Sequence, residues 1–475
     1  MKHVIIIGGG ISGLSAGIYC RKNGIDCTII EKNSFCGGNL TGWTRNGCYI
    51  DNCFHWLVGT APCTSLYGIW KEIGLIKNHS ELYQASVFYE SELGGEHIAF
   101  SRYPELTRLN MSLLSPKDTV EIDRFIDGVE AAADFMCHKN ISPNLLSAYG
   151  RYRRITLAQL GEKFVHPLLK IAFSDYIPGN FSAIALVWAY GAFACGNAMI
   201  PLGGSRNAAL RVENRFKELG GTIRYSTEAK KIVTNGNSAL GVITAHNEFI
   251  RADAVICCTD PSVTFGKLLP AERMPRPFAA LYNNQERAPR FSSFQAAFVC
   301  NSQKLPRFGT KVVPFKDDEL KRAGRMVIRE YSYEPNFSPE TQTVLQTMIF
   351  LNTEECEEWI TLAQKNAEYT ARKENHVNNI ISTLKSVFPT LDHNDISYLD
   401  SWTPASYKRY FSSDHGEYMA FSLTPKTPLK RYPCELRGLN NVFMATQWQC
   451  SPGGLPNAAR SGKQVATKLK RLLGS

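Results

Sequence analysis

The sequence predicts an α/β fold in which a Rossmann-type dinucleotide-binding domain is interrupted by a second, α+β domain. Within residues 3–31, a strand, a glycine-rich turn, a helix and a second strand follow one another. Further glycine-rich segments lie at 201–205 and 451–462, so pieces of one domain are far apart in the chain. With 475 residues, 44% hydrophobic and 20% charged, the composition is that of a globular protein and excludes a disordered or collagen-like one.

The first unit contains the motif GxGxxG in the context that dinucleotide binding requires. The apolar run 4–7 is typical of a buried parallel strand. Gly8 permits a tight turn, Gly10 lets the backbone approach a pyrophosphate, and Gly13 lets the helix pack close to the strand. We expect Gly10 and Gly13 to face the pyrophosphate at the helix N-terminus, where free N–H groups attract anions.

The second strand, 27–30, ends at Glu31, where an acid is expected to accept hydrogen bonds from a ribose. An acid there disfavours a 2′-phosphate, so we do not expect NADP in this site. The segment Gly37-Gly38-Asn39 follows, and a simple NAD domain does not need this double glycine.

Several segments along the chain carry a resemblance to known flavoproteins. Gly37-Gly38-Asn39 resembles the two-dinucleotide-binding-motif flavoproteins, in which this segment approaches the FAD pyrophosphate and ribityl chain. The strand 441–445 and the segment SPGGLPNAARSG at 451–462 resemble the C-terminal signature of phytoene desaturases, carotenoid isomerases and retinol saturases. The stretches 201–256 and 402–416 are similar to middle and late segments of the same family.

The resemblance implies an amine-oxidase-like fold that holds one FAD non-covalently. Ala229 would touch the adenine, and Gly453 and Gly454 would lie against the isoalloxazine ring. The sequence departs from the family pattern at Asn39, where relatives often have Arg or Lys, and at Cys53 and Thr446. The implied FAD-binding residues are Gly8, Gly10, Ile11, Ser12, Gly13, Glu31, Lys32, Gly38, Asn39, Ala229, Thr446, Gly453, Gly454 and Leu455.

The segments implied to bind FAD lie far apart in the chain, and their positions predict the domain boundaries. We assign residues 1–75, 200–275 and 430–475 to the FAD-binding domain, and 75–200 and 275–430 to a substrate domain. The stretch 176–205 carries no charge, and its length would allow a membrane span. Its glycines and Pro201 favour a buried helix and turn beside a substrate pocket instead. Its aromatic residues are channel-lining candidates, or otherwise core residues: Trp188, Tyr190 and Phe193.

Two features near residue 50 are candidates for chemistry. His55 lies just after the Asp51 segment and is a candidate proton relay, although a lone histidine is more often structural. Cys48 and Cys53 have a spacing that resembles the redox pair of flavin disulfide reductases. Those enzymes carry a second GxGxxG for NAD(P)H, which is missing here, so we predict two buried thiols and no NAD(P)-binding domain. None of the 14 cysteines forms a CxxC pair, and we predict no metal site.

These observations favour an FAD-dependent oxidoreductase that acts on carbon–carbon bonds of a hydrophobic, isoprenoid or polyene-like substrate. Desaturation, saturation and cis-trans isomerisation all remain open. An amine-oxidase-like enzyme with a polar substrate is the first alternative. A non-catalytic flavin-binding protein, similar to a prenyl-protein escort, is the second.

Charge and cysteine usage bear on location. The net charge is +10, and the segment 460–475 holds five basic residues and no acid. No nucleic-acid-binding motif accompanies this charge, so we expect no nucleic acid partner but allow peripheral contact with an anionic membrane. The first strand does not read as a signal peptide, and free thiols favour a reducing compartment. We therefore expect a cytoplasmic protein, with its membrane contact at the inner face.

Overall fold

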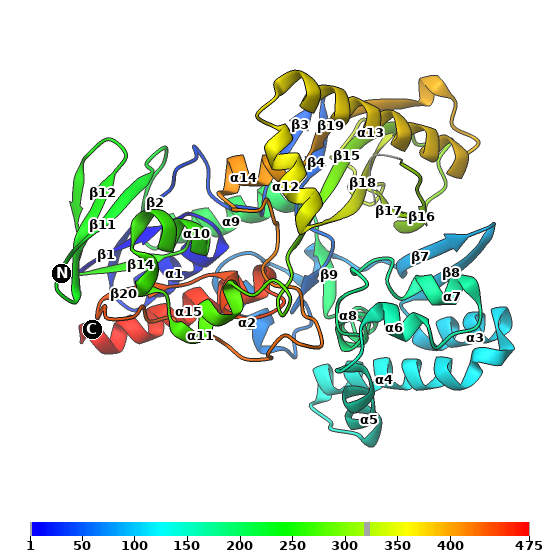
Figure 1. The fold of residues 1–475 in the computed structure, drawn as a ribbon, viewed down its shortest axis with the longest axis horizontal. Coiled ribbons are helices and arrows are strands. Elements are labelled where there is room, and N and C mark those ends of the chain that lie inside the picture. Colours follow the sequence, from blue (N-terminus) through cyan, green and yellow to red (C-terminus); the bar gives the residue numbers. More distant parts are fainter. Residues whose placement is uncertain (1, 318–323, 475) are drawn as a thin grey trace.

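The computed structural model describes residues 2–317 and 324–474. It has two parts that lie side by side (Figure 1). One part is built around a five-stranded sheet and contains both chain termini. The other is built around a seven-stranded sheet, with a group of helices below it in the view of Figure 1.

The five-stranded sheet is parallel and has the order β10-β2-β1-β14-β20. Its side chains alternate between two buried faces, which explains the unbroken apolar run of β1. Val4 and Ile6 pack on the helical side, whereas Ile5 and Ile7 pack on the side of a small antiparallel sheet. The elements are β1 (His3–Ile7), β2 (Asp26–Ile30), β10 (Thr222–Arg224), β14 (Ala254–Cys257) and β20 (Val442–Met444), with β11 (Ala229–Asn235), β12 (Ser238–Thr244) and β13 (Phe249–Arg251) in the small sheet.

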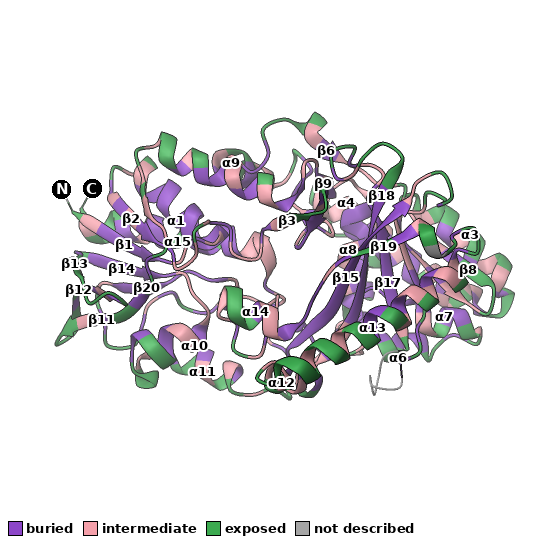
Figure 2. Cartoon of the chain, turned by 90° about the horizontal axis from the view of Figure 1, so that it is seen from above, coloured by how far each residue is buried: buried purple, intermediate pink, exposed green. Residues whose placement is uncertain are grey.

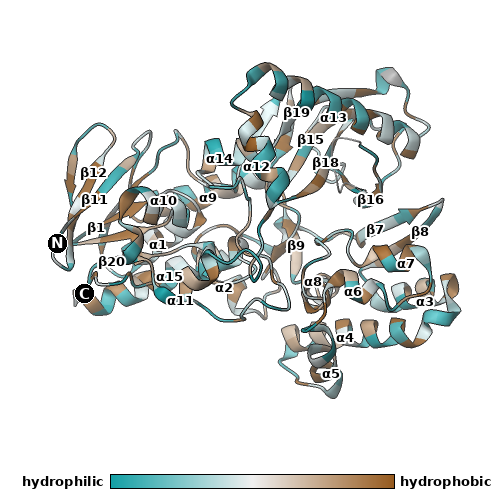
Figure 3. Cartoon of the chain, in the orientation of Figure 1, coloured by the Kyte–Doolittle hydropathy of each residue, from teal (hydrophilic) through white to brown (hydrophobic). Residues whose placement is uncertain are grey.

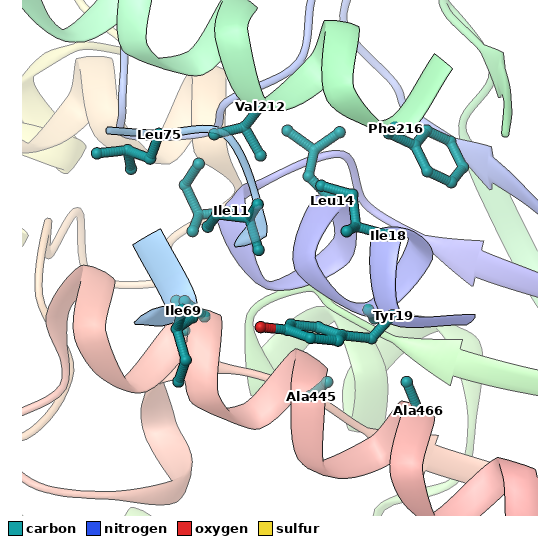
Figure 4. Close-up of a cluster of buried hydrophobic side chains, with 14 of the residues drawn as sticks. Ile11, Leu14, Ile18, Tyr19, Ile69, Leu75, Val212, Phe216, Ala445 and Ala466 are labelled. Atoms are coloured by element: carbon teal, nitrogen blue, oxygen red, sulfur yellow. The ribbon is translucent and has the colours of Figure 1, made fainter. Parts of the chain in front are cut away.

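Helix α1 (Ile11–Lys22) lies between α9 (Gly204–Glu218) and α15 (Gly454–Leu473), and apolar side chains fill the space between them (Figure 4). The crossing of α1 and α15 is close because Gly462 has no side chain. A Cβ on Gly462 would lie 2.5 Å from the Ser12 oxygen and 2.6 Å from the Ala16 nitrogen. Ser15 Oγ also donates to the Ala459 carbonyl at 2.8 Å. This packing brings the N-termini of α1 and α15 to the same cavity.

The seven-stranded sheet has the order β19-β15-β18-β17-β16-β7-β8 and is antiparallel except between β16 and β7. Helices α12 (Thr353–Leu362) and α13 (Asn366–Val387) cover one face, and their outer surfaces are hydrophilic (Figure 3). The strands themselves are largely buried (Figure 2). They are β7 (Val87–Leu93), β8 (Glu96–Ser101), β15 (Phe291–Asn301), β16 (Thr310–Pro314), β17 (Arg325–Glu330), β18 (Gln342–Asn352) and β19 (Ile396–Trp402).

The remaining elements connect the two sheets or flank them. The strands are β3 (Gly42–Arg45), β4 (Cys48–Asp51), β5 (Leu57–Val58), β6 (Leu82–Tyr83) and β9 (Ala198–Pro201). The helices are α2 (Ser65–Glu72), α3 (Pro104–Leu114), α4 (Thr119–His138), α5 (Pro143–Tyr152), α6 (Leu157–Gly161), α7 (Pro167–Ala172), α8 (Ile184–Ala194), α10 (Pro261–Val263), α11 (Arg276–Tyr282) and α14 (Pro404–Phe411).

The charge-free stretch forms a buried helix followed by a turn and a short strand. Helix α8 packs against α4, and β9 pairs with β5 and β6. Among the residues that the structure describes, no helix has both the length and the apolar content needed to cross a membrane.

Candidate functional site

A cavity of about 700 Å³ lies where the glycine-rich first turn, the double glycine at 37–38 and the segment 451–462 meet. This volume is in the range of small-molecule and cofactor sites. Of the residues predicted to bind a cofactor, all but Gly13 line it, and so does His55. The lining set is Gly8, Gly10, Ile11, Ser12, Glu31, Lys32, Gly38, Asn39, His55, Ala229, Thr446, Gly453, Gly454 and Leu455.

The glycines of the first turn have separate tasks. Gly8 has a φ of +101°, a conformation that only glycine adopts easily. A Cβ on Gly10 would meet no atom within 4 Å, so this position is open to the cavity. A Cβ on Gly13 would lie 2.0 Å from the Gly8 carbonyl oxygen. Gly13 therefore serves the contact between strand and helix, and it is not among the residues that line the cavity.

Glu31 is a buried carboxylate at the cavity wall, 7% exposed. Its Oε2 accepts from the Gly9 N–H at 2.7 Å, and its Oε1 accepts from the Asn33 N–H at 2.8 Å. Burial raises the pKa of Glu31, and the two backbone hydrogen bonds oppose this. Each oxygen keeps one further lone pair, which suits the two hydroxyls of a ribose. Lys32 donates to Ser412 Oγ at 2.7 Å.

Asn39 holds an unused acceptor at the same wall. Its Nδ2 donates to the Tyr418 carbonyl at 3.0 Å, whereas its Oδ1 is buried without a hydrogen-bond partner in the described part of the chain. Buried polar atoms nearly always have partners. This oxygen, on a residue that lines the same cavity as Gly10, therefore fits a ligand that donates a hydrogen bond.

The N-terminus of α15 also borders the cavity. Gly453 and Gly454 both have a φ of +82°. A Cβ on Gly453 would collide with Ala420 at 2.6 Å, whereas a Cβ on Gly454 would meet only Pro456, at 3.7 Å. The N-cap residue Gly453 has no side chain to cap the helix, and Gln447 Oε1 accepts from the Gly454 N–H at 2.9 Å. The positive end of the helix dipole favours a group that carries negative charge in the cavity.

The Asp51 carboxylate fixes the segment that leads to His55. Asp51 accepts from the Ser205 N–H at 2.6 Å and Ser205 Oγ at 2.7 Å, in the first turn of α9. It also accepts from the N–H groups of Cys53 and Phe54, each at 2.9 Å. This caps α9 and holds residues 53–55 at the cavity.

The cysteines show no redox pairing. Cys48 is buried and Cys53 is half-buried, and both are free thiols. Burial raises the pKa of Cys53, and the negative charge of Asp51 raises it further. Both effects disfavour the reactive thiolate form.

One side of the cavity is apolar. Helix α8 contributes Ala185, Trp188, Ala189 and Ala192, and none of the lining residues in 176–192 is charged. Trp188 is therefore at the cavity as expected. Tyr190 is a core residue instead, because its hydroxyl donates to the Ser101 carbonyl at 2.7 Å.

Phe193 lines a second, smaller cavity of about 30 Å³. The two cavities share three wall residues, His55, Trp56 and Tyr176.

His55 is paired with an arginine that the sequence analysis missed. Arg329 Nη2 lies 2.9 Å from His55 Nε2. Since a guanidinium only donates, Nε2 is the acceptor and the ring hydrogen is on Nδ1. Burial, and then the charge of Arg329, hold the pKa of His55 well below its usual value. A neutral ring with Nε2 occupied does not favour the proposed proton relay. The signal available in the sequence was a positive charge at position 329, directly after the apolar run 326–328.

An acidic pair at the cavity was also missed. Burial and the neighbouring Glu417 raise the pKa of Asp260 to about 7. Arg290 pairs with Glu417 at 3.4 Å and offsets part of this negative charge. Asp260 lies three residues after the end of β14, so a polar residue shortly after a buried strand was the signal.

Comparisons with known proteins agree with this geometry. The family model described as flavin-containing amine oxidoreductase matches residues 11–470. The chain is 24% identical to the prolycopene isomerase of Arabidopsis thaliana, over 100% of this chain and 83% of that protein. It is 25% identical to the prolycopene isomerase of Daucus carota, over 59% of this chain but only 45% of that protein.

A third relative and two solved structures match nearly the whole chain. The 1-hydroxycarotenoid 3,4-desaturase of a Flavobacterium species is 23% identical, over 98% of each chain. An oxidoreductase from Methanosarcina mazei has a TM-score of 0.65 at 16% identity, covering 98% of this chain and 100% of its own. Putrescine oxidase has a TM-score of 0.59 at 14% identity, covering 99% of each. These structures share the amine-oxidase-like FAD-binding fold.

Proposed function

Since this chain belongs to the flavin-containing amine oxidoreductase family and FAD is its cofactor, we propose that it acts on carbon–carbon bonds of a hydrophobic, isoprenoid or polyene-like substrate. The observation that carries the proposal is the continuity of the cavity. The same cavity that contains Gly10, Glu31 and Gly454 extends along the uncharged face of α8. Relatives named as carotenoid isomerases and desaturases support the same substrate class.

Some residues around the cavity would bind the cofactor, and others would hold the substrate and exclude water. Glu31 and Asn39 would accept hydrogen bonds from the cofactor, and the N-terminus of α15 would stabilise negative charge on it. Bound FAD supplies hydride acceptance or donation. Trp188 and its apolar neighbours would hold the substrate in place without polar competition.

An amine substrate remains the second candidate, because Asp260 and Glu417 form an acidic pair at the cavity. Two features oppose it. Arg290 already pairs with Glu417, and Arg329 places a positive charge near the apolar side, where it would repel a protonated amine.

The test is the absorption spectrum of the anaerobic protein before and after addition of a polyene lipid in liposomes. We expect bleaching of the flavin band or a shift of the polyene spectrum, and no response to a primary amine. Ala189→Leu narrows the apolar side and should abolish the response. Ala194→Leu, on the same helix but outside the cavity lining, should not. A response to the amine alone would refute the proposal.

A further inference from the structure

Arg329 is a buried cation that has no carboxylate partner among residues 2–317 and 324–474. Its side chain is on β17, and the residue is 7% exposed. Nη2 donates to His55 Nε2 at 2.9 Å and lies 3.9 Å from Met348 Sδ, and Nε has no acceptor in the described part of the chain. Arg325, on the same strand, pairs with Asp175 at 2.6 Å, so the sheet can accommodate a buried ion pair where one is needed.

Two carboxylates that follow Arg329 in the sequence accept hydrogen bonds from other groups. Glu330, the next residue, accepts from the N–H and Oγ of Ser332 at 2.8 and 2.9 Å. Glu334 accepts from the Gly203 N–H at 3.0 Å. The electrostatic neighbours of Arg329 are instead four phenols, those of Tyr176, Tyr331, Tyr333 and Tyr418.

The side chain of Arg329 faces the smaller cavity, of about 30 Å³. A space of this size holds a few heavy atoms, since one water requires about 10–15 Å³ by this measure. It therefore suits a carboxylate and is too small for a nucleotide or a sugar. His55, Trp56 and Tyr176 line both cavities, so the small cavity lies directly beside the large one.

An unpaired buried charge strongly destabilises a protein, so a site that keeps one requires a compensating partner. The guanidinium fork matches a carboxylate and can donate two parallel hydrogen bonds to it. His55 orients this fork, because its Nε2 lone pair accepts from one Nη2 hydrogen.

We propose that Arg329 binds the carboxylate of an amphiphilic substrate, whose apolar body lies along α8 in the large cavity. The assignment of the apolar body rests on the function proposed above. The class of ligand is thus an isoprenoid or polyene acid rather than a pure hydrocarbon. His55 is the positioning residue for Arg329.

The experiment compares two probes, all-trans-retinoate and all-trans-retinol, which share one polyene body and differ in the end group. Binding to the FAD-loaded protein is followed by quenching of tryptophan fluorescence, since Trp56 and Trp188 line the cavity. We expect retinoate to bind about ten- to a hundredfold more tightly than retinol, the effect of hydrogen bonds to a charged group.

Arg329→Gln should abolish this preference and leave the affinity for retinol unchanged, and Arg329→Lys should keep part of it. Arg276→Gln removes the same charge from an exposed site and should change neither affinity. Flavin content and the melting temperature identify a variant that has not folded. In that case the comparison of the two probes on the parent protein decides.

Two results would overturn the proposal: equal affinities for the two probes in the parent, or a preference that survives in a folded Arg329→Gln protein. Displacement of retinoate by acetate at equal concentration would assign the small cavity to free anions, and would also overturn it. The measurement needs no turnover, so a protein that binds retinoate selectively but changes neither probe refutes only the proposed function.

Discussion

Replacement of Glu31 by alanine tests the cofactor site most directly. The carboxylate has about four acceptor positions, and the N–H groups of Gly9 and Asn33, at 2.7 and 2.8 Å, occupy two. Two positions are left for hydroxyls of the cofactor. Hydrogen bonds to a charged group contribute about 1.5–3 kcal/mol each, so the loss of two amounts to about 3–6 kcal/mol. We therefore expect FAD to bind at least about a hundredfold more weakly.

The assay is titration of the deflavinated protein with FAD, followed by flavin fluorescence. The substitution also leaves the buried Gly9 N–H without its acceptor, which lowers stability by about 1–3 kcal/mol. Thermal unfolding at saturating FAD separates this loss from the loss of affinity. Glu31→Gln keeps one acceptor oxygen and should lie between the parent and the alanine variant. Glu218→Ala, an exposed acid on α9, is the control and should bind FAD normally.

The same carboxylate predicts a pH dependence. Because burial raises the pKa of Glu31, it takes up a proton at a higher pH than an ordinary glutamate. Protonation removes acceptor positions, so the parent should release FAD as the pH falls through this raised pKa. For the substitution described above, a Glu31→Ala protein that binds FAD as tightly as the parent would refute the assignment of Glu31 to the ribose.

Three further predictions concern other parts of the chain. Gly454→Val should yield protein without flavin or with a shifted flavin spectrum, whereas Gly236→Val, also at positive φ but with open space around it, should keep a normal spectrum. Burial raises the pKa of Glu334 to about 7, so the folded protein loses stability as the pH rises from about 4.5 to 7. Denaturant unfolding at pH 5 and pH 8 should show that Glu334→Gln makes the pH dependence of the unfolding free energy smaller by about 1–3 kcal/mol. Lys470 and Arg471 are exposed, and anionic liposomes should bind the protein at low salt and release it when both are neutralised; a protein that stays in the supernatant would refute membrane docking.

The structure shows that two of the five basic residues in the C-terminal segment are paired elsewhere, and that the exposed Arg460 lines the large cavity. Lys463 lies 3.4 Å from Glu72 and over the ring of Tyr19, and Lys468 pairs with Glu435. The sequence shows five positive charges there, but ion pairing with distant segments decides which remain available.

The sequence by itself determined the features that depend on local stereochemistry. The turn at Gly8 needs a positive φ, and the open position at Gly10 needs the absence of a side chain. The motif GxGxxG between two strands therefore identified this part of the cofactor site. The uncharged stretch identified a buried helix, because apolar residues leave water wherever a core is available. FAD and the fold followed from these motifs and from the resemblance they carry.

Only the tertiary structure decided which groups meet across long separations in the chain. His55 and Arg329 are 274 residues apart, and the parity of β17 puts Arg329 on the cavity face, opposite the face that Met326 and Ile328 bury under α12 and α13. Likewise, the orphaned oxygen of Asn39 exists because Tyr418, 379 residues away, takes only its amide group. Strand register and the packing of distant elements determine these contacts, and no short stretch of the sequence specifies either of them.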